Sequence, residues 1–321
     1  MNPPKVLCIG KATQDVFLID DEFDPHCEGD VCYTHLPLGA KLDVTTAVFA
    51  PGGNATNVAV TLARQGIDTR YLWALGHDPA SLSALQALDG EGVDTSAVVQ
   101  DPSLQASYST VLVALNGGER TILNYKGALP APNDIERMLR IADKPDWVYP
   151  SSLGSVDSLT KVIDWAAKHD IKVMLNPSGS DLTEVAKLRS LLEDVEVLIA
   201  NKEEMQQLVE GSTVEELVMH GLHYCSVVIV TDGRNGACAS DGKTIVHSGL
   251  YDQKPSIERT GAGDAFASGF LSQWLLGKSL KDSLHFASAN SSSVVLQIGA
   301  KAGILERGAP LDPMELKERQ L

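Results

Sequence analysis

The sequence is poor in basic residues and in aromatic residues. It holds 26 lysine and arginine residues against 42 aspartate and glutamate residues, which gives a formal net charge of −16. Because nucleic acids and many membrane surfaces are anionic, this balance argues against a nucleic-acid or membrane partner. Aromatic residues make up only 5% of the chain, so few side chains indicate which ligand a pocket would hold.

Cysteine and long apolar runs are also scarce. The five cysteines are scattered and odd in number, so no disulfide framework is expected. The group His26, Cys27, Cys32 and His35 matches no usual zinc spacing, and we do not expect a zinc site there. The apolar run near the N-terminus is too short for a signal peptide, and no stretch has the length of a membrane span. These absences predict a cytoplasmic protein.

Apolar residues are nevertheless plentiful, at 44% of 321 residues, enough for one large α/β domain or two small ones. From Gly127 onward, short β-prone segments alternate regularly with segments of helical period. This alternation predicts a mostly parallel sheet covered by helices on both faces, a three-layer α/β/α fold. The expected strands include Lys5–Ile9, Trp147–Tyr149, Ile171–Leu175, Val195–Ala200 and Val227–Thr231.

Two β-rich stretches interrupt this pattern. Residues 16–48 contain short β-prone pieces between Asp, Pro and Gly turns, and residues 107–125 contain two more around Asn116-Gly117-Gly118, which reads as a hairpin turn. We expect them to form a small separate sheet. The remaining ranges, 1–15, 49–106 and 126–321, would form the α/β core.

The most informative stretch is Gly261-Ala262-Gly263-Asp264, a small-residue turn followed by the helical spacing of Phe266, Phe270 and Trp274. The free N–H groups at the start of that helix could bind a phosphoryl group. A carboxylate would repel such an anion unless it had another task. Accepting a proton from an attacking hydroxyl is such a task, and we assign it to Asp264.

This stretch, together with Gly52-Gly53-Asn54-Ala55-Thr56-Asn57, resembles the two signatures of the PfkB or ribokinase-like family of sugar and nucleoside kinases. The similarity runs from Gly10 to Gly299. It implies the ribokinase-like fold, a β-sheet lid over the acceptor site that often forms a homodimer surface, and ATP with Mg²⁺. Within the motif, Asp264 would be the general base and Gly261, Ala262 and Gly263 would form the anion hole.

The acceptor would lie at the carboxyl end of the first strand, where open α/β sheets bind ligands. Asp15 matches the family residue that holds a sugar hydroxyl, and Gly53 and Asn57 match residues that bind the acceptor. Gly52 and Asn54 belong to the same turn. The alternative is structural, with Asn54 as a helix N-cap and the glycines as the turn before it.

The metal and nucleotide residues come from the second half of the chain. Asn201 and Glu204 resemble the family motif that organises Mg²⁺, although the same spacing is nearly a capping box. Thr231 and Gly233 match the nucleotide loop, and a glycine-rich hairpin is the alternative. Asn290 matches the region beside the adenine, where a polar helix face explains it equally well.

The chain departs from the family pattern just before the anion hole, where Glu258-Arg259-Thr260 replaces the usual Asp-Thr-Thr or Asp-Ser-Thr. Activation by a monovalent cation, which this segment supports in related kinases, is therefore open. Arg259 would touch a phosphate or face the solvent.

The sequence thus predicts an ATP-dependent kinase for a hydroxyl of a small sugar, with a nucleoside as the next choice. A P-loop enzyme is disfavoured because the required upstream glycine is missing, since residue 272 is serine. A dinucleotide-dependent oxidoreductase is disfavoured because no Gly-x-Gly-x-x-Gly turn follows the first strand. A binding protein that kept the fold without the activity is the rival from another class.

Overall fold

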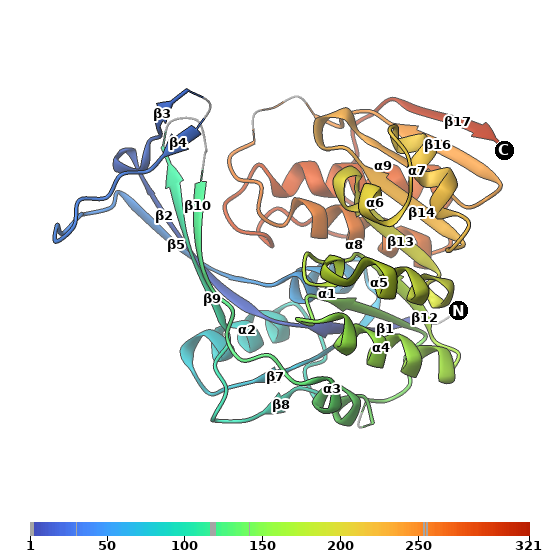
Figure 1. Cartoon of the computed structure of the whole chain (residues 1–321), viewed down its shortest axis with the longest axis horizontal. Helices are drawn as coiled ribbons and strands as arrows, with labels where there is room; N and C mark the ends of the chain where they lie inside the picture. Colours follow the sequence, from blue (N-terminus) through green and yellow to red (C-terminus); the bar gives the residue numbers. More distant parts are fainter. Residues whose placement is uncertain (1–2, 30, 116–119, 141, 253, 255) are drawn as a thin grey trace.

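A nine-stranded sheet forms the centre of the molecule (Figure 1). The computed structural model describes residues 3–29, 31–115, 120–140, 142–252, 254 and 256–321. In space the strands follow the order β17-β16-β15-β14-β13-β12-β11-β1-β6. Their bounds are β1 (Lys5–Gly10), β6 (Asp68–Leu72), β11 (Trp147–Ser151), β12 (Lys172–Leu175), β13 (Val197–Asn201), β14 (Val227–Thr231), β15 (Ala237–Ser240), β16 (Thr244–Ser248) and β17 (Leu316–Gln320).

Most of this sheet is parallel, as the sequence predicts. β6, β1, β11, β12, β13 and β14 pair in parallel, and β14 to β17 pair in antiparallel fashion at one edge. The inner parallel strands β1, β11, β12, β13 and β14 are buried along nearly their whole length, which is why their sequences are largely apolar runs without alternation. The edge strand β17 was not predicted, because its residues are polar and mostly exposed.

Helices cover both faces of the sheet and complete the three-layer fold. On one face α8 packs against α1 and α9, and on the other α3 to α7 follow one another. None of the described helices has the length and apolar character of a membrane span. The helices are α1 (Asn54–Arg64), α2 (Pro79–Gly90), α3 (Pro132–Leu139), α4 (Val156–Lys168), α5 (Val185–Leu191), α6 (Lys202–Leu208), α7 (Val214–Gly221), α8 (Ala262–Leu275) and α9 (Leu280–Val294).

A smaller four-stranded sheet projects from the core, as expected from the two β-rich stretches (Figure 1). Its strand order is β10-β9-β2-β5, and its inner face carries the buried side chains of Phe17, Val111 and Val113, which contact Ile298 of the core. The predicted turn at 116–118 lies outside the described residues. The strands are β2 (Thr13–Asp20), β5 (Thr46–Gly52), β9 (Ser107–Ala114) and β10 (Arg120–Tyr125).

A disulfide corrects the expectation for the cysteines. Cys27 in β3 (His26–Glu28) and Cys32 in β4 (Val31–Tyr33) are directly opposite each other in this exposed two-stranded ribbon and are bonded. Spacing alone could not reveal the pair, because the antiparallel register brings the two residues together. The rings of His26 and His35 lie 5.5 Å apart, and the described residues contain no cluster of three or more side chains suited to a metal. Two further short strands, β7 (Ala74–Leu75) and β8 (Val99–Gln100), pair beside α2 and α3.

Candidate active site

The start of α8 has the geometry expected of an anion-binding turn. Gly261 precedes the helix with φ of 82°, and a Cβ at this position would lie 2.4 Å from Cβ of Ala300, so only glycine fits. Ala262 N–H makes a 3.3 Å bond to the carbonyl of Arg259. The N–H groups of Gly261, Gly263 and Asp264 have no hydrogen-bond acceptor among the described residues. Of the four N–H groups from Gly261 to Asp264, three are therefore available to a ligand.

The surroundings of Gly263 differ from those of Gly261. A Cβ on this residue would meet nothing within 4 Å, and its φ is not in the left-handed region. Neither backbone strain nor a neighbouring protein atom explains the glycine. The open space above it is the space in which a phosphoryl group would approach the N–H groups.

Asp264 lies at the junction between this turn and α1. Its Oδ2 accepts a 2.8 Å hydrogen bond from Nδ2 of Asn57, whereas no hydrogen bond within the described part of the chain reaches Oδ1. The pKa of Asp264 is raised to about 6, chiefly by burial and also by nearby Asp15, while Asn57 and Lys301 oppose the shift. One oxygen is thus fixed and the other is free, with a proton affinity suited to exchange near neutral pH.

Asp15 faces Asp264 from β2 in the smaller sheet. Burial raises the pKa of Asp15, and the Ser109 hydroxyl and Lys301 oppose this shift. A Cβ on Gly52 would lie only 2.0 Å from Oδ2 of Asp15. The structure therefore brings together Asp15, Gly52, Asn57 and Asp264, which lie far apart in the sequence.

The alternative interpretation, in which Asn54 is the N-cap of the helix, is wrong. Gly53, with φ of 100°, is the N-cap of α1, and Asn54 is the first residue of the helix. No hydrogen bond of the Asn54 side chain is present among the described residues, and this side chain is only partly buried. Asn54 therefore has an amide that makes no hydrogen bond within the described part of the chain and that helix capping does not explain.

Lys301, in the loop after α9, was not singled out from the sequence. Its Nζ donates to the carbonyl of Pro51 at 2.7 Å, to Oγ1 of Thr56 at 2.9 Å and to Oδ1 of Asn57 at 2.6 Å. Burial lowers the pKa of Lys301 to about 7, although Asp15 and Asp264 oppose the shift. The lysine lies more than 240 residues from its partners in the sequence, so no local spacing could have indicated it.

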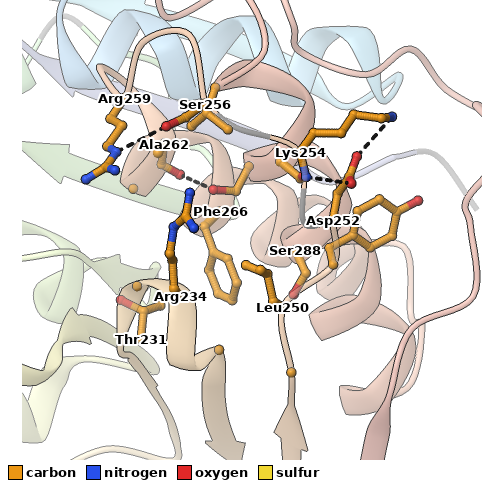
Figure 2. A pocket seen from close by; sticks show the side chains of 18 residues that line it. Thr231, Arg234, Leu250, Asp252, Lys254, Ser256, Arg259, Ala262, Phe266 and Ser288 are labelled. Atoms are coloured by element: carbon orange, nitrogen blue, oxygen red, sulfur yellow. Dashed lines mark hydrogen bonds and ion pairs between the residues drawn. The ribbon is translucent and has the colours of Figure 1, made fainter. Parts of the chain in front are cut away.

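A cavity of about 300 Å³ opens beside the Gly261–Asp264 turn (Figure 2). Thr231 and Gly233 line it, as predicted, together with Ala262 and Gly263. Phe266 and Leu250 also line the cavity and lie close together in this view. The cavity thus has an apolar part and a part rich in backbone donors.

Two arginines project toward the turn from different segments (Figure 2). Arg234 follows β14 and Arg259 precedes α8, and both line the cavity. Arg259 Nε donates to Oγ of Ser256 at 3.2 Å, and within the described part of the chain neither guanidinium pairs with a carboxylate. In a chain of net charge −16, two unpaired cations beside three free N–H groups favour an anionic ligand.

Asn201 and Glu204 form a complete capping box at the start of α6. Asn201 N–H donates to Oε2 of Glu204 at 2.9 Å, and Glu204 N–H donates to Oδ1 of Asn201 at 2.8 Å. Burial raises the pKa of Glu204. The capping bond uses one carboxylate oxygen, and the other remains. One carboxylate oxygen is a sufficient protein contribution for Mg²⁺, which usually keeps several waters and binds substrate phosphates.

Asn290 lies outside the cavity lining. Its amide donates to the carbonyl of Ala265 at 2.8 Å and accepts a 2.9 Å bond from Leu305 N–H, and the residue is fully buried. Both ends of the amide are used in joining α9 to α8 and to the following loop. Its predicted contact with the nucleotide is not part of the site proposed below.

Comparison with known proteins identifies the family of the chain. The pattern described as pfkB family carbohydrate kinase matches residues 3–307, and the chain belongs to this family. Ribokinase from Bacillus subtilis is 26% identical over 265 residues, which cover 82% of this chain and 87% of that protein. An ATP-dependent ribose-1-phosphate kinase from Halopiger xanaduensis is 27% identical over 303 residues, covering 93% and 94%.

The fold is also that of solved kinases. The structure of Arabidopsis thaliana ribokinase complexed with ribose and ATP matches with a TM-score of 0.75 at 22% identity, over 96% of this chain and 97% of that one. The predicted ribokinase-like fold and membership of the carbohydrate kinases are confirmed.

Proposed function

We propose that this kinase transfers the γ-phosphoryl group of ATP to a hydroxyl of a small sugar, with Asp264 as the general base. The observation that carries the proposal is the position of Asp264, in the turn that borders the cavity and in hydrogen-bond contact with Asn57 of the second motif. Thr231, Ala262 and Gly263 line the cavity, and Asp15, which does not line it, is close enough to influence the ionisation of Asp264. The ribose and ATP bound to the Arabidopsis ribokinase support this pairing of ligands.

The reaction follows from the free oxygen of Asp264. The acceptor hydroxyl, held by Asp15 and the Gly52–Gly53 turn, loses its proton to Oδ1 of Asp264 as its oxygen forms a bond to the γ-phosphorus. The bond from this phosphorus to the β–γ bridging oxygen breaks, and ADP leaves. The N–H groups of Gly261, Gly263 and Asp264 stabilise the charge on the transferring oxygens.

Glu204 would hold Mg²⁺ through water at the nucleotide side, and the ion would neutralise charge on the phosphates. We do not include a monovalent cation. The Glu258 carboxylate accepts hydrogen bonds from Thr260 N–H at 2.8 and 2.9 Å and from its hydroxyl at 2.6 Å, and it pairs with Arg120 Nε at 3.4 Å. The guanidinium already supplies a balancing charge.

The two β-rich stretches, residues 16–48 and 107–125, which supply most of the smaller sheet, would act as a lid on the α/β core. Its Arg120 reaches Glu258 just before the anion hole, and its inner apolar cluster contacts Ile298. Closure would exclude water and protect ATP from hydrolysis. Slower hydrogen exchange of both segments with acceptor bound would support a lid, and equal exchange in the two states would oppose it.

The outer face of this sheet would form a homodimer. By strand register Phe49, Tyr108, Leu123 and Tyr125 share this face, and all four are exposed, Phe49 to 69%. Sedimentation at micromolar concentration would detect the dimer, and Phe49→Glu should weaken it. In a reducing cytoplasm, the proposed location, Cys27 and Cys32 would be thiols.

The direct test is ADP release with Mg²⁺-ATP and a panel of sugars, sugar phosphates and nucleosides. We expect turnover with a sugar and its loss in Asp264→Asn. Turnover only with nucleosides would move the acceptor to that class. Ligand binding without turnover across the panel, seen as a rise in Tm, would identify a binding protein of the same fold.

A further inference from the structure

We infer that Lys301 is a positioning residue that orients the side chain of Asn57 and so presents Asp264 with one oxygen fixed and the other free for the acceptor. The inference rests on the proposed function, since it concerns the same general base. It assigns a role to a residue of the loop after α9, outside both sequence motifs.

The hydrogen bonds of Lys301 exclude a direct contact with substrate. Below its pKa of about 7, Lys301 is an ammonium group with three N–H donors and no acceptor. All three are used, at 2.7 Å to Pro51 O, 2.9 Å to Thr56 Oγ1 and 2.6 Å to Asn57 Oδ1. No donor is left for a sugar hydroxyl or a phosphate, so the effect of Lys301 must pass through the residues it holds.

Asn57 is the residue through which that effect passes. Its amide lies between the Lys301 ammonium, which can only donate, and the Asp264 carboxylate, which accepts when ionised. The oxygen of the amide must therefore face Lys301, and the nitrogen must face Asp264. A flipped amide would place NH₂ against the ammonium and oxygen against the carboxylate, with two repulsions in place of two bonds. Lys301 thus ensures that Asn57 donates to Oδ2 of Asp264.

Thr56 connects Lys301 to the Gly52–Gly53 turn as well. Its hydroxyl oxygen accepts a hydrogen bond from Lys301 Nζ. The hydroxyl donates toward two carbonyl oxygens, that of Gly52 at 2.7 Å and that of Gly53 at 2.8 Å. With the contact to Pro51 O, the lysine ties the end of β5 to the first turn of α1. The turn beside Asp15 and the orientation of Asn57 are therefore fixed by one ammonium group.

The charge of Lys301 acts on the ionisation of the site as well. Asp15 from β2, Asp264 from α8 and Glu91 after α2 are the carboxylates that face Lys301, and Lys301 lowers the pKa of both Asp15 and Asp264. The buried Tyr149 hydroxyl of β11 also lies near Asp264. Glu258 and Lys11 act on Asp15 with opposite signs. Removing the ammonium should therefore raise the pKa of Asp264.

The test compares pH profiles of kcat for the parent, Lys301→Met, Lys301→Arg and the control Lys278→Met, whose lysine is exposed after α8. For Lys301→Met we expect the midpoint of the acid limb to move upward by about 1 pH unit, with about tenfold lower kcat near pH 6. The KM for ATP should stay within about threefold of the parent value. Lys301→Arg should keep the acid limb of the parent, because its charge persists.

A loss of kcat that is equal at every pH, or an acid limb that does not move, would overturn the inference. If Lys301→Met does not fold, Lys301→Gln, which is neutral but can donate, replaces it under the same criteria. Carbon-13 NMR of labelled aspartate provides a readout without turnover, with Asp264→Asn identifying the resonance. An unchanged titration of Asp264 in Lys301→Met would refute the inference even if the proposed function holds. A moved titration in a protein without kinase activity would support the inference and reject the function.

Discussion

The carboxylate of Asp15 lies directly against the backbone of Gly52. A Cβ at residue 52 would be 2.0 Å from Oδ2 of Asp15 and 2.9 Å from its Cγ. The φ of Gly52 is not in the left-handed region, so the close approach of this carboxylate, and not backbone strain, requires glycine there. The first glycine of the motif therefore fixes the position of a side chain 37 positions earlier in the sequence, by residue number.

We expect Gly52→Ala to displace the Asp15 carboxylate and to raise the KM for the acceptor by about 10- to 100-fold, the cost of one misplaced charged hydrogen-bond partner. ATP affinity should change little, because the nucleotide cavity is on the other side of the turn. Gly179→Ala is the matched control, since a Cβ there meets nothing within 4 Å. Unchanged acceptor kinetics in Gly52→Ala would remove Asp15 from the acceptor site.

Gly263→Ala should separate ligand binding from folding. The added methyl group meets no protein atom but fills the space above the free N–H groups. We expect Tm to be unchanged or slightly higher, because alanine favours helices by up to about 1 kcal/mol relative to glycine. Turnover should fall by about 10²-fold, as for removal of one oxyanion donor. Gly90→Ala, also a helical glycine with open space, should leave turnover intact; equal activity of the two variants would contradict the anion hole.

Asp264→Asn should lower turnover by about 10²–10⁴-fold, the range for loss of a general base. The same substitution should stabilise the protein at neutral pH. The folded-state pKa of Asp264 is raised from 3.8 to about 6, so ionisation costs the folded state stability. This cost is absent below about pH 4, grows as the pH rises, and is complete above about pH 6.

Asparagine carries no such cost, so the Tm of Asp264→Asn should exceed that of the parent above pH 6 and approach it toward pH 4. The gain in unfolding free energy is at most about 3 kcal/mol. Thermal unfolding at several pH values measures it. A Tm difference that does not depend on pH would mean that Asp264 is not a buried, ionising carboxylate.

Glu204→Gln should raise the Mg²⁺ concentration needed for half-maximal turnover by about tenfold or more, with little change in acceptor KM. Glutamine can still accept from Asn201 N–H, so α6 should keep its capping box and the Tm should change by a few degrees at most. The exposed neighbour Glu203→Gln is the control. Superimposable Mg²⁺ titrations of parent and Glu204→Gln would leave only the capping role.

The sequence predicted the parts of the site that local spacing encodes. Glycines at a helix start, an acidic residue in the first turn and apolar runs for buried strands all act over a few residues, so Asp264 and the order of strands and helices could be recognised. It could not place contacts made by tertiary packing. Lys301 meets Asn57 only because the loop after α9 passes over α1, and the Cys27–Cys32 bond depends on strand register.

Asn290 illustrates a second limit of local spacing. A polar residue in the helix after Ser279 suggested a ligand contact, whereas its amide satisfies Ala265 O and Leu305 N–H inside the protein. A buried amide and a ligand-binding amide look alike in a sequence, because the partner atoms are backbone groups that any residue provides.

The loop between α9 and residue 304 cannot change its length freely, although surface loops commonly tolerate insertions. Ile298 contacts the smaller sheet, Ala300 lies against Gly261, and Lys301 holds Asn57. Each of these three neighbouring residues thus contacts a different part of the protein. One inserted residue would displace at least one of the three by about 3.5 Å. Variation among relatives should therefore appear in this loop as substitutions, while additions of sequence accumulate elsewhere.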